Sequence, residues 1–398
     1  MPADAAPLSD AAPLSDAAPL FDAATPDLPI PTGAFRHPGV LLNRQQLDFV
    51  RDQVRAGAEP WKSAFERARN SEVASLSWTP RPRALVECGA SSNPNLGCSD
   101  ERQDALAAYT HALLWNITLD EAHARKAIEI LDAWSAVLTG HALHNAPLQG
   151  GWAAAPFSRA AELMRWTYGG WSPAGIERFA RMLKTAYEPT IGKSTGANGN
   201  WELIMIDATI GVAVFTEDRP LFDRAVAMWR KRVPAYIYLT SDGPTPVPPP
   251  VGDRTTAESL AGFWKTSVFQ ADGQAQETCR DFGHTSWGLA AAINTAETAL
   301  QQGVDLYAVE GRRLRAGLEF HAAFIHGAPV PPWLCGGRVR LATLPFWEIA
   351  FNHFATRLQM DLPHTRALIE AQVRPSGSNY FIAWETLTHA QAGWVGLR

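Results

Sequence analysis

Apolar residues recur at helical spacing along most of the chain from about residue 45 onward, and period-two alternation typical of strands is almost absent. Start motifs agree with this pattern, since Ser172-Pro173 places a capping residue before a proline at the first helical position. We therefore expect an all-α fold. The predicted helices cover residues 104–116, 121–138, 158–168, 172–187, 201–215, 220–236, 277–301, 306–325, 345–358 and 362–372.

Strongly apolar helices alternate with amphipathic ones, as in 201–215 and 121–138. This alternation predicts an inner layer of helices buried by an outer layer, and a curved double layer of helical hairpins is the simplest such arrangement. The periods are too irregular for a consensus solenoid. The proline-rich segment 240–265 is too long for a simple connection, so we expect a functional or mobile loop there.

The first thirty residues repeat the motif Asp-Ala-Ala-Pro-Leu-Ser, a composition that cannot bury enough apolar surface to order itself. We interpret residues 1–30 as a disordered low-complexity tail and residues 31–398 as a single domain. No basic segment followed by an apolar one indicates a signal peptide in this chain.

The net charge is −5, and no run of Lys/Arg or basic-aromatic stripe is present. This argues against nucleic acid and against a membrane surface as partners. No apolar stretch approaches the roughly 20 residues of a transmembrane helix. We expect a monomer without nucleic-acid or membrane partners.

Four cysteines are present. Cys88 and Cys98 flank a Gly/Ser/Asn/Pro loop that a disulfide can close, which would imply an oxidising compartment. Cys279 and Cys335 lie in well-patterned segments and are expected to be buried thiols. No Cys/His spacing indicates a zinc site, so we expect neither a metal nor a cofactor. A secreted or periplasmic protein is the expected localisation.

Two polar segments, 196–202 and 272–284, each open a long apolar helix. Asn198 and Asn200 stand at the start of the first helix. Glu277, Arg280 and His284 stand at i, i+3 and i+7, which places them on one predicted helical face that becomes apolar further along. Such helices deliver polar side chains to a cleft.

Fifteen tryptophans is a high count, and several lie in or beside polar loops, where aromatic faces can stack on sugar rings. The alternative is that they are large core residues at helix ends. Trp201 and Trp264 adjoin the polar segments and are favoured as substrate-binding residues. Trp152 and Trp333 are further candidates.

The motif Asn198-Gly-Asn200-Trp201, followed downstream by Asp272-Gly-Gln and by Glu277, Arg280 and His284, resembles the alginate lyase superfamily. The closest resemblance is to polysaccharide lyase family 38, with family 5 more distant, and it covers about residues 35–390. It implies an incomplete (α/α) toroid whose inner helices line a groove for a uronic acid polymer. It also implies cleavage by β-elimination without a metal.

Elimination removes the C5 proton of a uronate, which requires neutralisation of the neighbouring carboxylate. Asn198 and Asn200 lie at a helix start, where amide groups and the helix dipole favour an anion. Arg280 can supply a bidentate positive charge. His284 is the expected base or neutraliser, since histidine titrates near working pH.

The acid is not assigned by the motif. Relatives commonly use a tyrosine, but His284 occupies the position where family 5 carries it. Tyr236 and Tyr238 are the best placed alternatives, and Tyr380 is the third.

Other interpretations of these residues remain open. Asn200 can be a helix cap, Glu277 and Arg280 an ordinary ion pair on a helix surface, and His284 a satisfied buried histidine. A noncatalytic glycan-binding protein would use the same tryptophans. A glycoside hydrolase would need two facing carboxylates from the set Asp207, Glu277, Asp281, Glu348 and Glu385.

Overall fold

The computed structural model describes residues 33–391, and the tail predicted for residues 1–30 lies outside them. Helices dominate this part of the chain, and none of them is long and apolar enough to cross a membrane. The helices are α1 (Arg44–Arg55), α2 (Trp61–Arg69), α3 (Cys98–Thr118), α4 (Glu121–Val137), α5 (Ala146–Thr167), α6 (Pro173–Met182), α7 (Glu188–Ile191), α8 (Gly199–Phe215), α9 (Arg219–Arg232), α10 (Ala257–Trp264), α11 (Phe282–Gln301), α12 (Tyr307–Ile325), α13 (Glu348–Phe351), α14 (Pro363–Leu368) and α15 (Glu385–His389).

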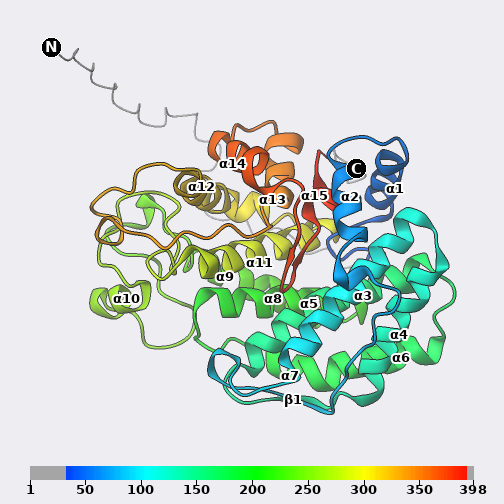
Figure 1. The fold of residues 1–398 in the computed structure, drawn as a ribbon. Coiled ribbons are helices and arrows are strands. Elements are labelled where there is room, and N and C mark those ends of the chain that lie inside the picture. Colours follow the sequence, from blue (N-terminus) through cyan, green and yellow to red (C-terminus); the bar gives the residue numbers. More distant parts are fainter. Residues whose placement is uncertain (1–32, 392–398) are drawn as a thin grey trace.

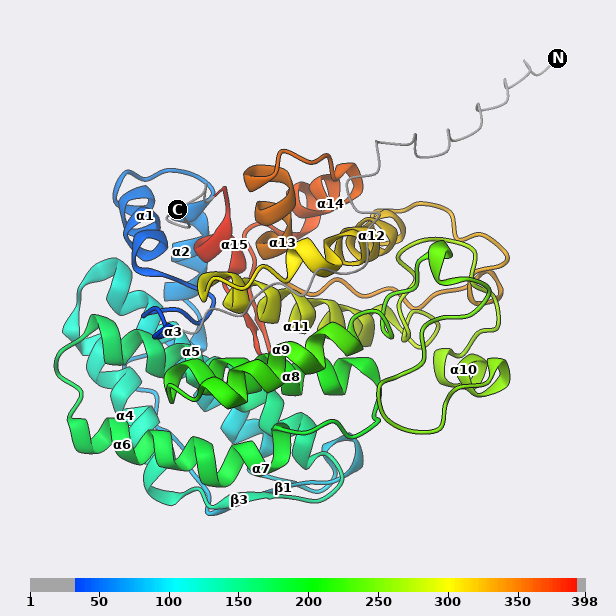
Figure 2. The ribbon, with the colours of Figure 1, turned by 180° about the vertical axis from the view of Figure 1, so that it is seen from behind.

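The long helices form two layers, with α3, α5, α8 and α11 side by side in the inner one (Figures 1 and 2). Each inner helix is followed in the chain by an outer one, giving the hairpins α3–α4, α5–α6, α8–α9 and α11–α12. All of α8 except Trp201 is buried, whereas α4 buries one stripe ending at Trp134. The predicted all-α double layer is confirmed.

Three inner helices begin at clearly different places from those predicted, and the first of them, α3, starts at Cys98 rather than at residue 104. α5 starts at Ala146 rather than at residue 158, because Gly150, Gly151 and an internal proline concealed its first half. A Cβ at Gly151 would lie 3.2 Å from the backbone of Ile204, so glycine lets α5 pack closely on α8. α11 starts at Phe282 rather than at residue 277, after Asp281 caps it.

Short strands and one further helix occupy the connections. β1 (Leu85–Cys88) pairs antiparallel with β2 (Asn95–Leu96) and parallel with β3 (Gly140–Ala142). β4 (Ser378–Asn379) and β5 (Ile382–Ala383) form a hairpin. The segment 240–265, predicted as a loop, contains α10.

All four cysteines are paired in disulfides. Cys88–Cys98 forms as the sequence allowed, and it joins the end of β1 to the start of α3. The expectation of thiols at Cys279 and Cys335 is wrong, because these two residues are bonded to each other. The segment after α12 crosses the start of α11, where Phe282 N–H donates to the Arg340 carbonyl at 2.9 Å, and this non-local approach brings the two sulfurs together.

Candidate active site

The two polar segments meet where α8 begins. Asn200 Nδ2 donates to both carboxylate oxygens of Glu277 at 2.6 and 2.7 Å, and the Asn200 backbone N–H donates to the same carboxylate at 3.2 Å. The Gly199 N–H donates to Gln276 Oε1 at 2.6 Å. The N-cap of α8 is Asn198, so the interpretation of Asn200 as a cap is wrong. The amides of Gly199 and Asn200 are therefore already satisfied by the neighbouring segment rather than free for an anion.

Glu277 and Arg280 precede α11 instead of lying on it, so the predicted helical stripe through both of them and His284 is wrong. The Arg280 N–H donates to the Glu277 carbonyl at 2.9 Å in a turn, and Arg280 Nη1 lies 3.0 Å from Glu277 Oε1. Glu277 is 2% exposed and Arg280 32% exposed. The pair is therefore not an exposed ion pair on a helix surface. It presents only the guanidinium to solvent.

His284 lies in the first turn of α11, above the carboxylate that caps that helix. Asp281 Oδ1 accepts the His284 backbone N–H at 2.9 Å, and Asp281 Oδ2 lies 2.7 Å from His284 Nδ1. Burial alone would raise the pKa of Asp281, but the hydrogen bonds from His284 lower that pKa to about 2. Since an ionised carboxylate only accepts, Nδ1 carries a proton, and in the neutral form of the ring the lone pair is on Nε2. The His284 side chain is 27% exposed.

An aromatic cluster, made of Trp152, Trp287 and Tyr380, adjoins His284. The ring centroids of His284 and Trp287 are 5.1 Å apart, and those of Trp287 and Tyr380 are 5.0 Å apart. Trp152 lies 4.6 Å from Tyr380 and 5.7 Å from Trp287. α5, α11 and the β4–β5 hairpin each contribute one ring.

The red C-terminal segment, which contains the β4–β5 hairpin, crosses the inner helices (Figure 1), and Tyr380 lies in the turn of that hairpin. Asn379 Oδ1 accepts the Trp287 indole N–H at 2.9 Å, and the Phe381 carbonyl accepts Arg159 Nη1 at 2.6 Å. These two bonds hold both sides of the turn. Sequence reasoning ranked Tyr380 third, because nothing local to it indicates this contact.

The hydroxyls of Tyr236 and Tyr238, the favoured acids, both donate hydrogen bonds to backbone carbonyls. The Tyr236 hydroxyl is buried and donates to the Thr285 carbonyl at 3.2 Å, and burial raises its pKa well above the usual value. The Tyr238 hydroxyl donates to the Gly243 carbonyl at 2.7 Å, and its pKa is also raised by burial. Neither ring contacts the aromatic cluster among the ring pairs of residues 33–391.

The predicted substrate-binding residues separate into half-buried and buried groups. Trp201 is half-buried, edge-on to His144 at 5.5 Å, and Trp333 is half-buried beside the disulfide loop. Asn198 is half-buried as well. Trp264 is 1% exposed on α10, where it packs on Phe269 as a core residue.

The carboxylates considered for a hydrolase are mostly buried in other interactions. Asp207 binds Arg159 Nη2 at 2.7 Å, and Glu348 binds Arg374. Glu385 accepts backbone N–H groups at the start of α13. Of the five carboxylates, only Asp281 is more than 5% exposed.

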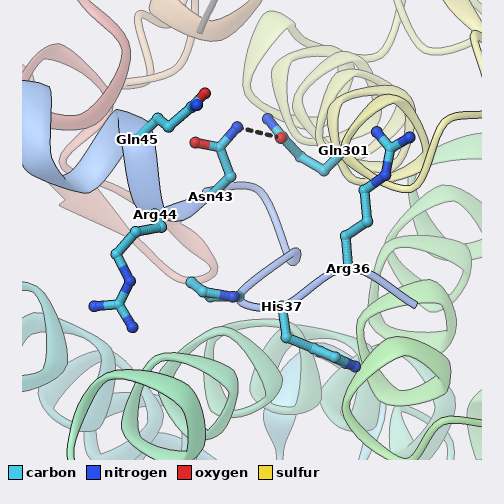
Figure 3. A pocket seen from close by; sticks show the side chains of 7 residues that line it. Arg36, His37, Asn43, Arg44, Gln45 and Gln301 are labelled. Carbon is cyan, nitrogen blue, oxygen red and sulfur yellow. Dashed lines mark hydrogen bonds between the residues drawn. The ribbon is translucent and has the colours of Figure 1, made fainter. Parts of the chain in front are cut away.

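A pocket of about 190 Å³ lies at the opposite end of α11 (Figure 3). Its lining includes Arg36, Arg44 and Gln301, and Asn43 Nδ2 donates to Gln301 Oε1 at 2.9 Å. Gln301 ends α11 whereas His284 lies in its first turn, a separation of about 25 Å along a helix axis. The pocket shares no lining residue with the site around His284.

The chain is similar to known proteins both in sequence and in fold. Residues 82–246 match the sequence model of the alginate lyase family. The solved structure of alginate lyase A1-III from Sphingomonas species A1 is 16% identical, with a TM-score of 0.60 over 89% of this chain and 99% of that one. A variant of A1-III complexed with a tetrasaccharide aligns with a TM-score of 0.59 at 16% identity, over 89% of this chain and 98% of that one.

An alginate lyase from Bacteroides ovatus has a TM-score of 0.54 at 14% identity, over 89% of this chain and 99% of that one. No curated protein sequence matches the chain. The solved structures confirm the expected (α/α) toroid, while membership of polysaccharide lyase family 38 stays a prediction. The family match runs from β1 to α9, and the chain shares the fold of the solved alginate lyases.

Proposed function

We propose that this enzyme depolymerises a 1,4-linked uronic acid polymer of the alginate or glucuronan type by metal-independent β-elimination. The observation that carries the proposal is the Asp281–His284 pair beside the aromatic cluster containing Tyr380. A similar alginate lyase binds a tetrasaccharide, which supports a saccharide chain as the ligand. The aromatic faces suit stacking on sugar rings.

His284 is the base. Asp281 fixes Nδ1 as the protonated nitrogen, so Nε2 can take the C5 proton of the uronate. The imidazolium that forms is stabilised by the same carboxylate. The partly exposed side chain of His284 is accessible to a bound polymer.

Arg280 neutralises the uronate carboxylate. Its guanidinium is held at Nη1 by Glu277 and is the most exposed member of its cluster, so its remaining N–H groups are free to bind a carboxylate. Asn200 acts indirectly: its side-chain amide donates to Glu277, which in turn binds Arg280. This assigns Asn200 to positioning rather than to direct contact with the substrate.

Tyr380 is the acid. As the C5 proton moves to His284, the C4–O bond breaks, a C4–C5 double bond forms, and the phenol gives its proton to the leaving glycosidic oxygen. Tyr380 is the first residue of a two-residue turn and has φ of 54°, a conformation that favours glycine. A tyrosine held in such a conformation indicates that its side chain is needed there.

A glycoside hydrolase is less well supported. It needs two accessible carboxylates across a groove, but Asp207, Glu277 and Glu348 are buried in ion pairs. Both disulfides support a secreted or periplasmic protein, since such bonds persist in oxidising compartments.

The direct test is incubation with alginate, polyglucuronate and an uncharged glycan, followed by ultraviolet absorbance of unsaturated ends. Absorbance with at least one polyuronate is expected. New reducing ends without this absorbance would establish hydrolysis instead, and binding without either product would establish a noncatalytic protein.

The acid is tested by Tyr380→Phe, which removes only a hydroxyl and should lower turnover by about 10²-fold or more. Tyr238→Phe is the matched control, because its hydroxyl is bound to the Gly243 carbonyl, and it should retain turnover. Full activity in Tyr380→Phe with loss in Tyr238→Phe would reverse the assignment.

A further inference from the structure

A buried guanidinium beside the candidate site has no carboxylate partner. Arg102 lies in the second turn of α3 and is 9% exposed. Its Nη1 donates to Gln149 Oε1 at 2.5 Å and its Nη2 to Ser99 Oγ at 3.4 Å, both neutral acceptors. Within residues 33–391, no acidic oxygen lies within 4 Å of it. Burying an unpaired charge is costly, so this arrangement requires a compensating function.

Arg102 faces the aromatic cluster. Its Cζ lies 4.7 Å from the centroid of Tyr380 and 5.4 Å from that of Trp152. Burial lowers the pKa of Arg102, and the charges of Tyr380 and Glu101 oppose that shift. The guanidinium is therefore close enough to Tyr380 for the two groups to interact electrostatically.

A hydrogen-bonded network fixes the position of Arg102. Gln149 Nε2 donates to Glu101 Oε2 at 2.5 Å and to the Cys98 carbonyl at 3.0 Å, so the amide oxygen must face Arg102. Glu101 Oε1 is occupied by the Tyr187 hydroxyl at 2.6 Å and by His141 Nε2 at 2.8 Å. The network holds the cation in place while keeping Glu101 from pairing with it directly.

We propose that Arg102 is a positioning residue for proton donation by Tyr380, which stabilises the negative charge that develops on the phenol as its proton leaves. The inference rests on the proposed function, in which Tyr380 is the acid. The phenolate is formed during bond cleavage, so a fixed cation lying over the ring stabilises the transition state more than the ground state. The cost of the unpaired buried charge is offset at that moment.

The test is a double-mutant cycle measured as release of unsaturated ends. Arg102→Gln should lower kcat by about 10²-fold with KM changed less than about 3-fold, because Arg102 does not contact substrate. Arg102→Lys, which keeps the charge, should recover part of that loss. In the Tyr380→Phe enzyme, Arg102→Gln should cause no further loss, because no phenolate forms.

Equal losses from Arg102→Gln in both backgrounds would overturn the proposal, since Arg102 would then act on the substrate or on the fold. A kcat of the Arg102→Gln variant equal to that of the wild-type enzyme would also overturn the proposal. If Arg102→Gln does not fold, Arg102→Lys carries the same cycle, with a several-fold loss expected only when Tyr380 is present. Failure of the proposed function looks different, because then the wild-type enzyme yields no unsaturated ends or Tyr380→Phe alone is fully active.

Discussion

The buried carboxyl of Glu385 makes stability depend on pH in a predictable direction. Burial raises the pKa of Glu385 to about 8, from a usual value of 4.5, and the neighbouring carboxylate of Glu348 adds to the shift. Arg159 and the backbone N–H groups of Glu348 and Ile349 oppose it without cancelling it. In the folded enzyme at neutral pH, this carboxyl is therefore protonated.

The sign follows from linkage. The pKa of Glu385 is higher in the folded state than in the unfolded state, so the folded state binds the proton more tightly. The stabilisation that this proton gives to the folded state is fully present below pH 4.5. It is lost as the pH rises towards 8. Each pH unit in this window costs about 1.4 kcal/mol. Between pH 5 and pH 7, the loss due to Glu385 is about 3 kcal/mol.

Glu385→Gln removes this titration while keeping an oxygen that accepts the two backbone N–H groups. The free energy of unfolding in urea, followed by tryptophan fluorescence and far-ultraviolet circular dichroism, should move by about 3 kcal/mol in favour of the variant between pH 5 and pH 7. Glu66→Gln, at an exposed position of α2, is the control and should show no such change. The same difference between variant and wild type at both pH values would refute a protonated Glu385.

Three further predictions concern the site. Asp281→Asn keeps a good helix cap but no longer fixes the protonated nitrogen of His284, so turnover should fall by about 10²-fold or more with a change in unfolding free energy below about 1 kcal/mol; equal turnover would remove Asp281 from the mechanism. Replacing Cys279 and Cys335 by serine opens a loop with a sequence separation of 56 and should lower the free energy of unfolding in urea by about 4 kcal/mol. KM should rise, because the segment that bears Arg280 is then less constrained. An unchanged KM would contradict this link between the disulfide and the site. Activity should survive dialysis against EDTA, since Arg280 supplies the positive charge; loss that calcium restores would contradict that assignment.

Much of the candidate site follows from local sequence. The motif around Asn200 and the segment from Glu277 to His284 both open apolar helices, and parallel inner helices bring their starts to one end of the fold. The role of Asp281 was not identified, although an aspartate three residues before a histidine at a helix start is a recognisable cap. The prediction that Glu277, Arg280 and His284 share one helical face was wrong because Asp281 caps α11, so the helix begins only at Phe282.

The contact of Tyr380 with Trp287 and the position of Arg102 could not be predicted in this way, so Tyr380 ranked only third among the tyrosines. Tyr380 lies 93 positions after Trp287 in the chain, and its hairpin has no apolar period that points to α11. Arg102 looks like an ordinary polar residue in the first turns of α3, and only its burial under Tyr380 distinguishes it. The Cys279–Cys335 bond depends in the same way on a segment that crosses α11 from a distance.

The sequence by itself determined the helices, their alternation between inner and outer layers, and the polar residues at the starts of α8 and α11, because helical periodicity and capping are local properties of the chain. Only the tertiary structure decided which side chains are buried in pairs, which tyrosine joins the aromatic cluster beside His284, and where an unpaired cation lies. Those outcomes depend on contacts between segments far apart in the chain, whose approach is set by packing of the whole core.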